Sequence, residues 1–417
     1  MIGPGCLALP AAFKQAGLWT GFIMVFCFGL LNKYCMLQLV NSSQYLSRKK
    51  GDAKLDFGAV AYEAFDNSFE RCKKFKNVAK FIVNGSIIVF QFGACCVIYV
   101  FLGSHLKEVI DEYTTYHIPK STYFLYMLIP LIIINFIRPL KVIVLFSAIG
   151  NVFMITVLAV VFQYLVQGSK NTSELPWITN FNGVMSAAGS ILYAFEGQSI
   201  VLVMENKLKH PEDMCGQVGV LSTGMNLVII VYAACGFFGF AKYGSDVKGS
   251  ITLDLPKTVE FTTVKVLLII IVFFGSLIQF YVIIDMTWPT IRRFLTTKFF
   301  PSKFAFPLEL CYRAILVTIT MIIAILVPNL EEIIPLVGVT AGMSMAFFYP
   351  PVIDTITFLP GLLQKYKRAS DDQKFKVKIG IIFRLIRNGC LIFVACFGCI
   401  AGLNSAIRDL INSHSSS

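Results

Sequence analysis

The sequence contains ten long apolar runs, most of them about 20 or more residues in length. A helix of that length crosses about 30 Å of hydrocarbon. Inside lipid, backbone polar groups must be satisfied within the segment or by a closed barrel, and these runs lack the alternation of barrel strands. The sequence therefore predicts an all-α integral membrane protein with ten full spans. The runs lie at 18–44, 78–104, 121–137, 142–166, 183–204, 216–240, 262–288, 306–327, 332–357 and 379–402.

The distribution of charge supports this class and gives an orientation. Only 14% of the residues are charged, whereas about a quarter are charged in a typical soluble domain. The net charge of +12 suggests nucleic acid at first, but Lys and Arg gather in the short segments between runs. Roughly 22 of them share one side with loop 45–77 and roughly 7 lie on the other, which makes that loop cytosolic. We expect a lipid bilayer and no nucleic acid as partner, a transmembrane domain over 1–404, and a short non-cytosolic tail over 405–417.

A possible glycosylation site agrees with this orientation. Asn171-Thr172-Ser173 is a sequon in loop 168–182, which the charge rule places on the luminal or extracellular face. Sequons are common by chance, and those at Asn41 and Asn84 lie at or inside apolar runs. Asn171 is therefore a candidate acceptor, while the topology rests on the charges.

Two helix interruptions point to a binding site. Gly3-Pro4-Gly5 interrupts the first segment, and Phe195-Glu196-Gly197 interrupts the run five helices later. Broken helices offer free N–H and C=O groups near the bilayer midplane, and these bind carboxylates, amines or ions. Gly and Pro are also common in ordinary membrane helices, but two breaks at matching positions favour a site shared by two five-helix halves.

Charged residues inside the runs are candidates for function because each costs roughly 2.5–3.5 kcal/mol at the bilayer centre. Glu196 lies deepest, beside the second break, and is the candidate for proton coupling or amine recognition. The alternative is a buried carboxylate bonded to helix-end N–H groups. We assign no function to the remaining charged or histidine residues, which we expect at boundaries, with snorkelling stems, or solvated near the outer surface: Asp285, Glu205, Lys14, Lys33, Lys80, His105 and His117.

Several motifs in order resemble the amino acid/auxin permease family, and in particular its proton-coupled amino acid transporter branch. The opening Ile2-Gly3-Pro4-Gly5-Cys6-Leu7-Ala8-Leu9-Pro10 with Lys14-Gln15-Ala16-Gly17 is similar to the first break of that branch. Further similarity is found at 92–102, at Phe195-Glu196-Gly197 with Glu205-Asn206-Lys207, at 244–256, at 279–282, and at 336–338 with Pro350-Pro351.

The resemblance implies an eleven-helix LeuT-type fold, with a 5+5 inverted repeat plus an eleventh helix. It also implies symport of small neutral amino acids with protons towards the cytosol, with no cofactor beyond the proton as coupling ion. Carried over to this sequence, Gly3, Pro4 and Gly5 would receive the substrate carboxylate. Phe195, Glu196 and Gly197 would complete the pocket, and Tyr99 and Gln279 would form its walls.

This sequence departs from the family pattern near its start. Pro4 stands where the branch has Thr or another small residue, and proline has no N–H to donate to a carboxylate. The family also has a half-helix and a histidine before the first break, and this sequence has neither. We therefore expect a first helix that is truncated at its N-terminus.

Two other function classes remain open at this stage. A non-transporting membrane sensor of the same fold would keep the pocket, although the cytosolic segments are short. A membrane enzyme would need a constellation of His, Cys or Ser residues, and the four scattered histidines do not form one. The particular amino acid, proton or sodium coupling, a plasma-membrane or lysosomal/vacuolar location, and the oligomeric state stay open.

Overall fold

The chain folds into a bundle of helices, and the computed structural model describes residues 3–114, 118–168, 172–195, 197–216, 218–299 and 301–416. Within these residues there is no β-strand. The helices of the first half are α1 (Leu9–Ala16), α2 (Leu18–Lys49), α3 (Phe57–Asp66), α4 (Glu70–Lys73), α5 (Lys76–Tyr113), α6 (Lys120–Asn135) and α7 (Leu140–Val166). Those of the second half are α8 (Phe181–Ala194), α9 (Gln198–Glu205), α10 (Val220–Tyr243), α11 (Val259–Lys298), α12 (Ala305–Leu326), α13 (Leu330–Val337), α14 (Tyr349–Arg368) and α15 (Asp371–Ser416).

All ten apolar runs coincide with helices, which confirms the membrane class. Among the described residues, nine helices or helix pairs are long and apolar enough to cross a membrane. The tenth run forms α6, which has only 16 residues. Nine of the ten predicted spans are therefore long enough to cross a membrane by themselves, and α6 is shorter than a full span.

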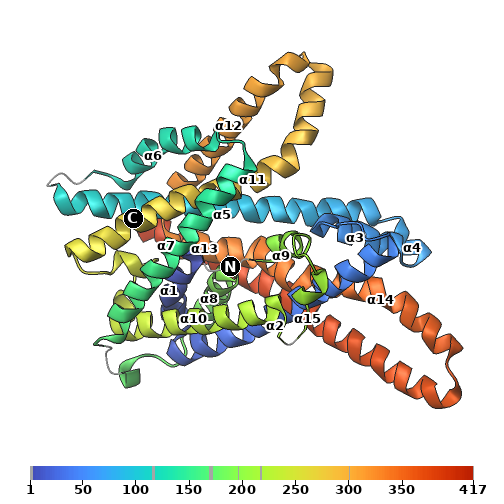
Figure 1. Cartoon of the computed structure of the whole chain (residues 1–417). Coiled ribbons are helices and arrows are strands. Elements are labelled where there is room, and N and C mark those ends of the chain that lie inside the picture. The colour runs from blue at the N-terminus through green and yellow to red at the C-terminus, as the bar shows by residue number, and fades with distance from the viewer. Residues whose placement is uncertain are drawn as a thin grey trace.

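The middle of the bundle contains two short and largely buried segments. The 3₁₀ helix η1 (Pro4–Ala8) leads directly into α1, and Leu7, Leu9 and Phe13 are fully buried. The segment α1 packs against α8 and α10, with α5 and α11 beyond α8 (Figure 1). Burial of these apolar side chains stabilises a helix as short as α1, whose polar residues Lys14 and Gln15 are only half-buried.

Two of the predicted spans are interrupted. The run at 183–204 is divided into α8 and α9, as the Phe195-Glu196-Gly197 break predicted. The run at 332–357 is divided as well, because the π-helical segments η7 (Gly338–Gly342) and η8 (Ser344–Phe348) lie between α13 and α14. Such π segments are rare and are frequent at functional sites.

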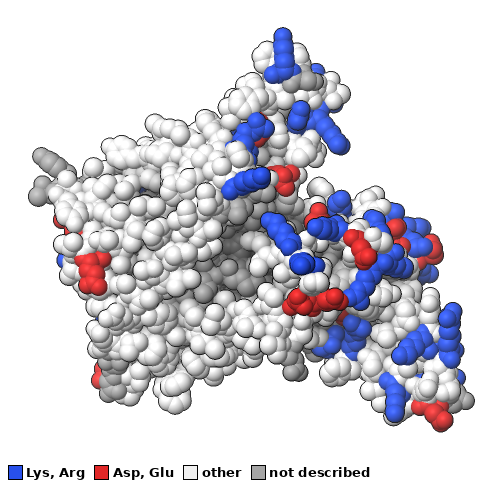
Figure 2. Space-filling view, in the orientation of Figure 1, with Lys and Arg blue, Asp and Glu red and all other residues white. Residues whose placement is uncertain are grey.

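The Lys and Arg side chains lie mainly at one end of the bundle. Figure 2 shows them over the loops that follow α2, α11 and α14, while the opposite end carries few. The face between these ends is largely uncharged (Figure 2). This distribution agrees with the orientation that the sequence predicted from its loops.

The C-terminal helix is longer than its apolar run. It extends from Asp371 to Ser416, so the residues from 405 onward, which the sequence analysis separated as a tail, continue the same helix as far as it is described. The Ser405 hydroxyl donates a hydrogen bond to the Asn182 carbonyl at 2.7 Å. This contact ties the end of α15 to the start of α8.

Candidate functional site

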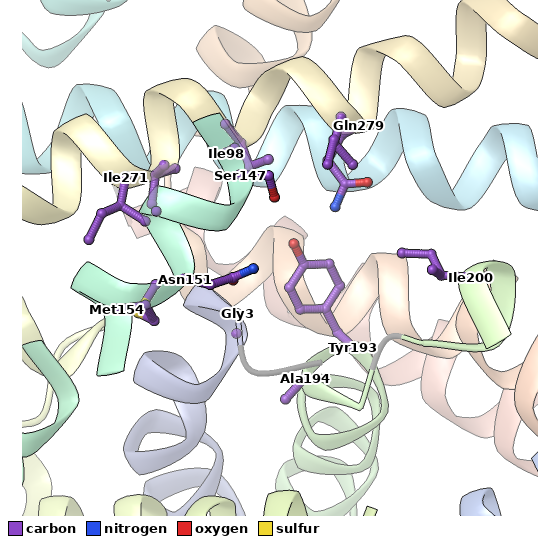
Figure 3. A pocket seen from close by; sticks show the side chains of 15 residues that line it. Gly3, Ile98, Ser147, Asn151, Met154, Tyr193, Ala194, Ile200, Ile271 and Gln279 are labelled. Atoms are coloured by element: carbon purple, nitrogen blue, oxygen red, sulfur yellow. The ribbon is translucent and has the colours of Figure 1, made fainter. Parts of the chain in front are cut away.

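A cavity of about 190 Å³ lies where the two broken helices meet (Figure 3). Its walls come from the start of η1, the end of α8, the start of α9, and the middle of α5, α7 and α11. The lining residues are Gly3, Gly5, Ile98, Ser147, Gly150, Asn151, Met154, Tyr193, Ala194, Ile200, Ile271, Val272, Gly275, Ile278 and Gln279. None of these carries a charged side chain, so the polar groups of the wall are neutral side chains and backbone.

The first break brings a helix start to this cavity. Gly3 precedes η1 in an extended conformation, and Pro4 occupies the first helical position. The first N–H groups of a helix have no acceptor within it, and the helix dipole makes this end positive. Pro4 contributes no donor, which leaves the N–H of Gly5 at the wall of the cavity. This end suits a carboxylate.

The second break brings a helix end to the same place. A Cβ atom on Gly5 would lie 3.0 Å from the Cα atom of Ala194, so the two breaks are in contact and only glycine fits without displacement. The carbonyl of Ala194 accepts a hydrogen bond from the Tyr232 hydroxyl at 2.9 Å. The carbonyl of Phe195 accepts one from the Asn32 amide at 3.2 Å. The end of α8 is therefore held by α10 and α2.

The structure places the sequence-predicted residues in different surroundings. Gly3, Gly5 and Gln279 line the cavity, and Pro4 begins η1. Phe195 and Gly197 line a smaller cavity of about 10 Å³ beside Asn32 and Gln198. Their roles in binding remain predictions.

Three other predicted residues do not reach this cavity or fall outside the described chain. The ring of Tyr99 is fully buried, and its hydroxyl donates to the carbonyl of Phe124 in α6 at 2.8 Å. Tyr99 is therefore not among the residues that line the cavity. Glu196, the candidate for proton coupling, and Asn171, the candidate for glycosylation, lie outside the described residues.

Three polar residues of the wall, Tyr193, Ser147 and Asn151, were not predicted from the sequence, whereas Gln279 was. Tyr193 and Gln279 point into the cavity from opposite sides, from α8 and α11 (Figure 3). Ser147 and Asn151 come from α7. With Gly150 between them, they follow the three- and four-residue spacing of one helix face. Small and polar residues at that spacing inside an apolar run are the sequence pattern that could have predicted this part of the wall.

The side of the bundle away from the basic loops is closed by the segment between α10 and α11. The ammonium group of Lys14 on α1 donates to the carbonyl of Val247 at 2.8 Å and lies 3.8 Å from the carboxylate of Glu331 on α13. A Cβ atom on Gly249 would lie 2.9 Å from the Cβ of Leu330. Lys14 was expected only to snorkel, but it joins three segments over the outer side of the cavity.

His105 also differs from its expected surroundings. From the sequence this histidine was expected at or near the outer surface, yet its side chain is fully buried. Nδ1 contacts the carbonyl of Phe101 at 2.9 Å and Nε2 contacts the hydroxyl of Thr252 at 2.6 Å. The expectation of a solvated histidine was wrong because the segment 247–255 folds back over this end of α5.

One acidic group in this outer segment has a strongly shifted pKa. The pKa of Asp254 is raised to about 6, mainly by burial and in smaller part by the carboxylates of Glu108 and Glu331. The backbone N–H of Lys248, which donates to Asp254 at 2.9 Å, and the charge of Lys248 oppose that shift. Asp254 therefore changes its charge between pH 5 and 7.

Comparisons with known proteins agree with this geometry. Residues 1–386 match the model of a family described as transmembrane amino acid transporter protein. The chain is 32% identical over 421 residues to the probable amino acid transporter skat-1 of Caenorhabditis elegans, covering 100% of this chain and 88% of that protein. It is 28% identical over 415 residues to the proton-coupled amino acid transporter-like protein pathetic of Drosophila melanogaster, covering 99% and 83%.

Proposed function

Because this chain belongs to the transmembrane amino acid transporter family, we propose that it is a secondary active transporter that moves small neutral amino acids together with protons. The observation that carries the proposal is the central cavity at the contact of two broken helices. Transporters bind their substrates in such places. The family and its relatives are transporters and not enzymes.

The wall of the cavity supports the substrate class. An amino acid carries a carboxylate and an ammonium group, which the N–H groups at the start of η1 and the carbonyl end of α8 would bind. The described wall offers no charged side chain to pair with a charged substrate side chain, and leaving such a charge unpaired in a buried site is costly. Gly3, Gly150 and Gly275 in the wall carry no side chains and leave space in the cavity for a small substrate.

We also propose that the bundle contains two halves of five helices in inverted orientation. The break at Gly3-Pro4-Gly5, which precedes η1 and α1, and the break between α8 and α9 would head the two halves, and α15 would be the eleventh helix. Two features support this arrangement: the breaks are in contact, and each begins a segment of the central layer. In such transporters one half or bundle moves against the other around a fixed site.

The described conformation corresponds, in this proposal, to a state closed on the outer side. The contacts of Lys14 with Val247 and Glu331 cover the cavity there. Figure 2 shows the surface hollowed in the middle of the visible face, next to the segments that carry Lys and Arg. A substrate would therefore leave towards the basic side, which the charge rule assigns to the cytosol.

The uptake of labelled glycine, alanine and proline tests the proposal directly. Cells expressing the chain are compared with vector controls at outer pH 5.5 and 7.5, with sodium present or replaced by N-methylglucamine. We expect uptake that is higher at pH 5.5, independent of sodium, and not reduced by excess glutamate or lysine. The absence of pH-stimulated uptake of any amino acid would contradict the proposal, and binding of alanine without flux would favour a sensor.

The proton is proposed to travel on Glu196, since this is the acidic residue beside the second break. Glu196→Gln should reduce pH-stimulated uptake strongly, with little effect on the amount of protein in the membrane. Glu260→Gln, on the exposed first turn of α11, is the matched control. A fully active Glu196→Gln variant would show that this carboxylate is structural.

A further inference from the structure

Another and larger cavity lies between the basic ends of α14 and α15, far from the site described above. Its volume is about 550 Å³. It is lined by the cationic residues Lys365, Lys376, Arg384 and Arg387 and by apolar residues that include Leu362 and Phe383. Figure 1 shows α14 and α15 projecting together from the bundle as a hairpin, and Figure 2 shows Lys and Arg over the same region.

The cations of this cavity are only partly neutralised. Arg384 donates to both carboxylate oxygens of Asp354 at 2.9 and 2.8 Å, and Arg387 lies 3.6 Å from the same carboxylate. Asp354 is buried. Lys365 and Lys376 have no ion-pair partner among the described residues. Four cations against one carboxylate leave a net charge of +3 around the cavity.

The two guanidinium groups are held in place by their other contacts. Arg384 lies over the ring of Phe358 at 4.4 Å, and Arg387 lies over the ring of Tyr34 at 5.1 Å. Aromatic stacking and the buried carboxylate fix the planes of these groups. Each arginine keeps N–H donors that these contacts do not use, because a guanidinium has five. The cavity is therefore preorganised to bind an anion.

The position of the cavity along α15 identifies the kind of anion. Lys374, Lys376 and Lys378 lie at this end of α15, and exposed apolar side chains continue along the helix beyond the last of them, with Phe383 65% and Ile386 61% exposed. The cavity thus spans the change from a basic surface to a surface that faces hydrocarbon. Its occupant should carry negative charge at one end and apolar chains at the other.

We propose that this cavity binds the headgroup of an anionic phospholipid from the leaflet on the basic side. The phosphate would lie between Lys365 and Lys376 and accept hydrogen bonds from the arginines, since charge-assisted bonds to phosphate are strong. The acyl chains would follow Leu362 and Phe383 along the hairpin. Basic pockets between membrane helices on the cytoplasmic side favour such headgroups.

Binding of dioctanoyl phosphatidylserine to the purified chain in neutral detergent tests the proposal. The double variant Lys365→Gln/Lys376→Gln should weaken binding about thirtyfold, because each lysine near anionic lipid strengthens binding about fivefold. The control Lys367→Gln/Lys378→Gln removes the same charge from the same hairpin, but neither residue lines the cavity. We expect the control to weaken binding less than threefold. Elution as a single peak in size-exclusion chromatography shows that each variant is folded.

A second variant separates the cavity from general attraction between charges. A Cβ atom on Gly380 would meet no atom within 4 Å, so Gly380→Leu places a side chain in the cavity without changing the net charge. We expect a loss of lipid binding of at least tenfold. Unchanged binding in this variant, or equal losses in the two double variants, would overturn the proposal. Equal binding of phosphatidylcholine, or full competition by millimolar inorganic phosphate, would overturn it as well.

Discussion

Single residues set the dimensions of the central cavity. Gly275 lines it from α11, and a Cβ atom at this position would meet no atom within 4 Å. A larger residue would therefore extend into the cavity without disturbing the packing of the bundle. The same freedom exists at Gly224 in α10, which does not line the cavity, and the two glycines form a matched pair.

We predict that Gly275→Leu lowers alanine uptake about tenfold or more, since it occupies space that the substrate needs. The abundance of the variant in the membrane should stay at the wild-type level, and Gly224→Leu should transport normally. Initial uptake rates per amount of surface protein measure both. Normal uptake by Gly275→Leu would remove this cavity from the substrate path.

The raised pKa of Asp254 predicts how the stability of the folded chain depends on pH. Its pKa of about 6 in the folded chain is above the usual value near 3.9, so the folded state binds a proton more tightly than the unfolded state. The stabilising contribution is fully present below about pH 4 and is lost as pH rises through about 6. Asp254→Asn cannot ionise, while its amide oxygen still accepts from the N–H of Lys248.

We expect Asp254→Asn to reduce the fall of the apparent melting temperature between pH 5 and 7. Wild type and variant are compared in the same detergent by thermal unfolding at half-unit pH steps. Asp246→Asn, exposed in the same outer segment, should leave the wild-type profile unchanged. Identical profiles for wild type and Asp254→Asn would show that Asp254 does not control this dependence.

The residues of the candidate site were predictable where a local sequence pattern, such as a helix break, indicates them. Gly3 and Gly5 belong to a break that is visible in the sequence, and both line the cavity. Tyr193 was missed because a tyrosine in an apolar helix carries no local sign of a cavity. His105 was misjudged because its burial depends on Thr252, which is 147 residues away. Contacts of that range follow from tertiary packing.

At the scale of elements, the contact between α8 and η7 depends on two glycines. A Cβ atom on Gly338 would overlap the backbone carbonyl oxygen of Gly189. Backbone atoms cannot move aside cheaply, and overpacking of this kind typically costs about 1–3 kcal/mol. This close approach joins the helix before the second break to the π segment beside it.

Gly338→Ala should therefore lower the apparent melting temperature by several degrees and reduce the amount of protein that reaches the membrane. Gly361→Ala in α14, where a Cβ atom has open space, should be neutral or slightly stabilising. Fluorescence-detected size-exclusion chromatography after heating compares the two. Equal melting curves for both variants would show that the α8–η7 contact tolerates separation.

The elements themselves were largely predictable, because long apolar runs have one stable structure in lipid. All ten runs form helices, and the break in 183–204 falls between α8 and α9. The π segments η7 and η8 were not predicted. Neither charge nor proline interrupts 338–348, and the irregular turns appear where this stretch packs against α8 and α15.

At the scale of the whole molecule, the outer closure connects α1, α13 and the segment between α10 and α11 through Lys14. Removing its ammonium group should make opening on that side easier. Ile334 is buried beneath this layer, where it lines a small cavity with Gly249 and Leu330. A cysteine at this position reports on opening.

We predict that Lys14→Met raises the rate at which a membrane-impermeant maleimide labels Ile334→Cys from the outer side, in a background without other reactive cysteines. The increase should be several-fold. Lys33→Met, which removes only the contact of Lys33 with Asn226 at 2.9 Å, should not change the rate. An unchanged rate in Lys14→Met would show that other contacts keep the outer side closed.

The arrangement of the molecule was predictable only in part. The loop charges predicted the orientation, and the motifs predicted the family, which the comparisons confirm. The basic cavity of the α14–α15 hairpin was not predicted, because Lys365 and Lys376 belong to different helices and look like ordinary loop charges in the sequence. Their proximity follows from the tight turn at 369–370.

The short helix α6 has a consequence for the membrane around it. Its 16 residues span about 24 Å, against about 30 Å for the hydrocarbon core of a typical bilayer. Leu125, Tyr126, Ile129 and Ile133 are exposed along it by 52–66%, so lipid is in direct contact with this side. This difference of about 6 Å is a hydrophobic mismatch, which thinning of the bilayer next to α6 would remove at a cost of a fraction of a kcal/mol for each ångström. A thinner bilayer matches the length of this helix. The stability of this chain should therefore depend on the thickness of the host membrane and be greater in a thinner one.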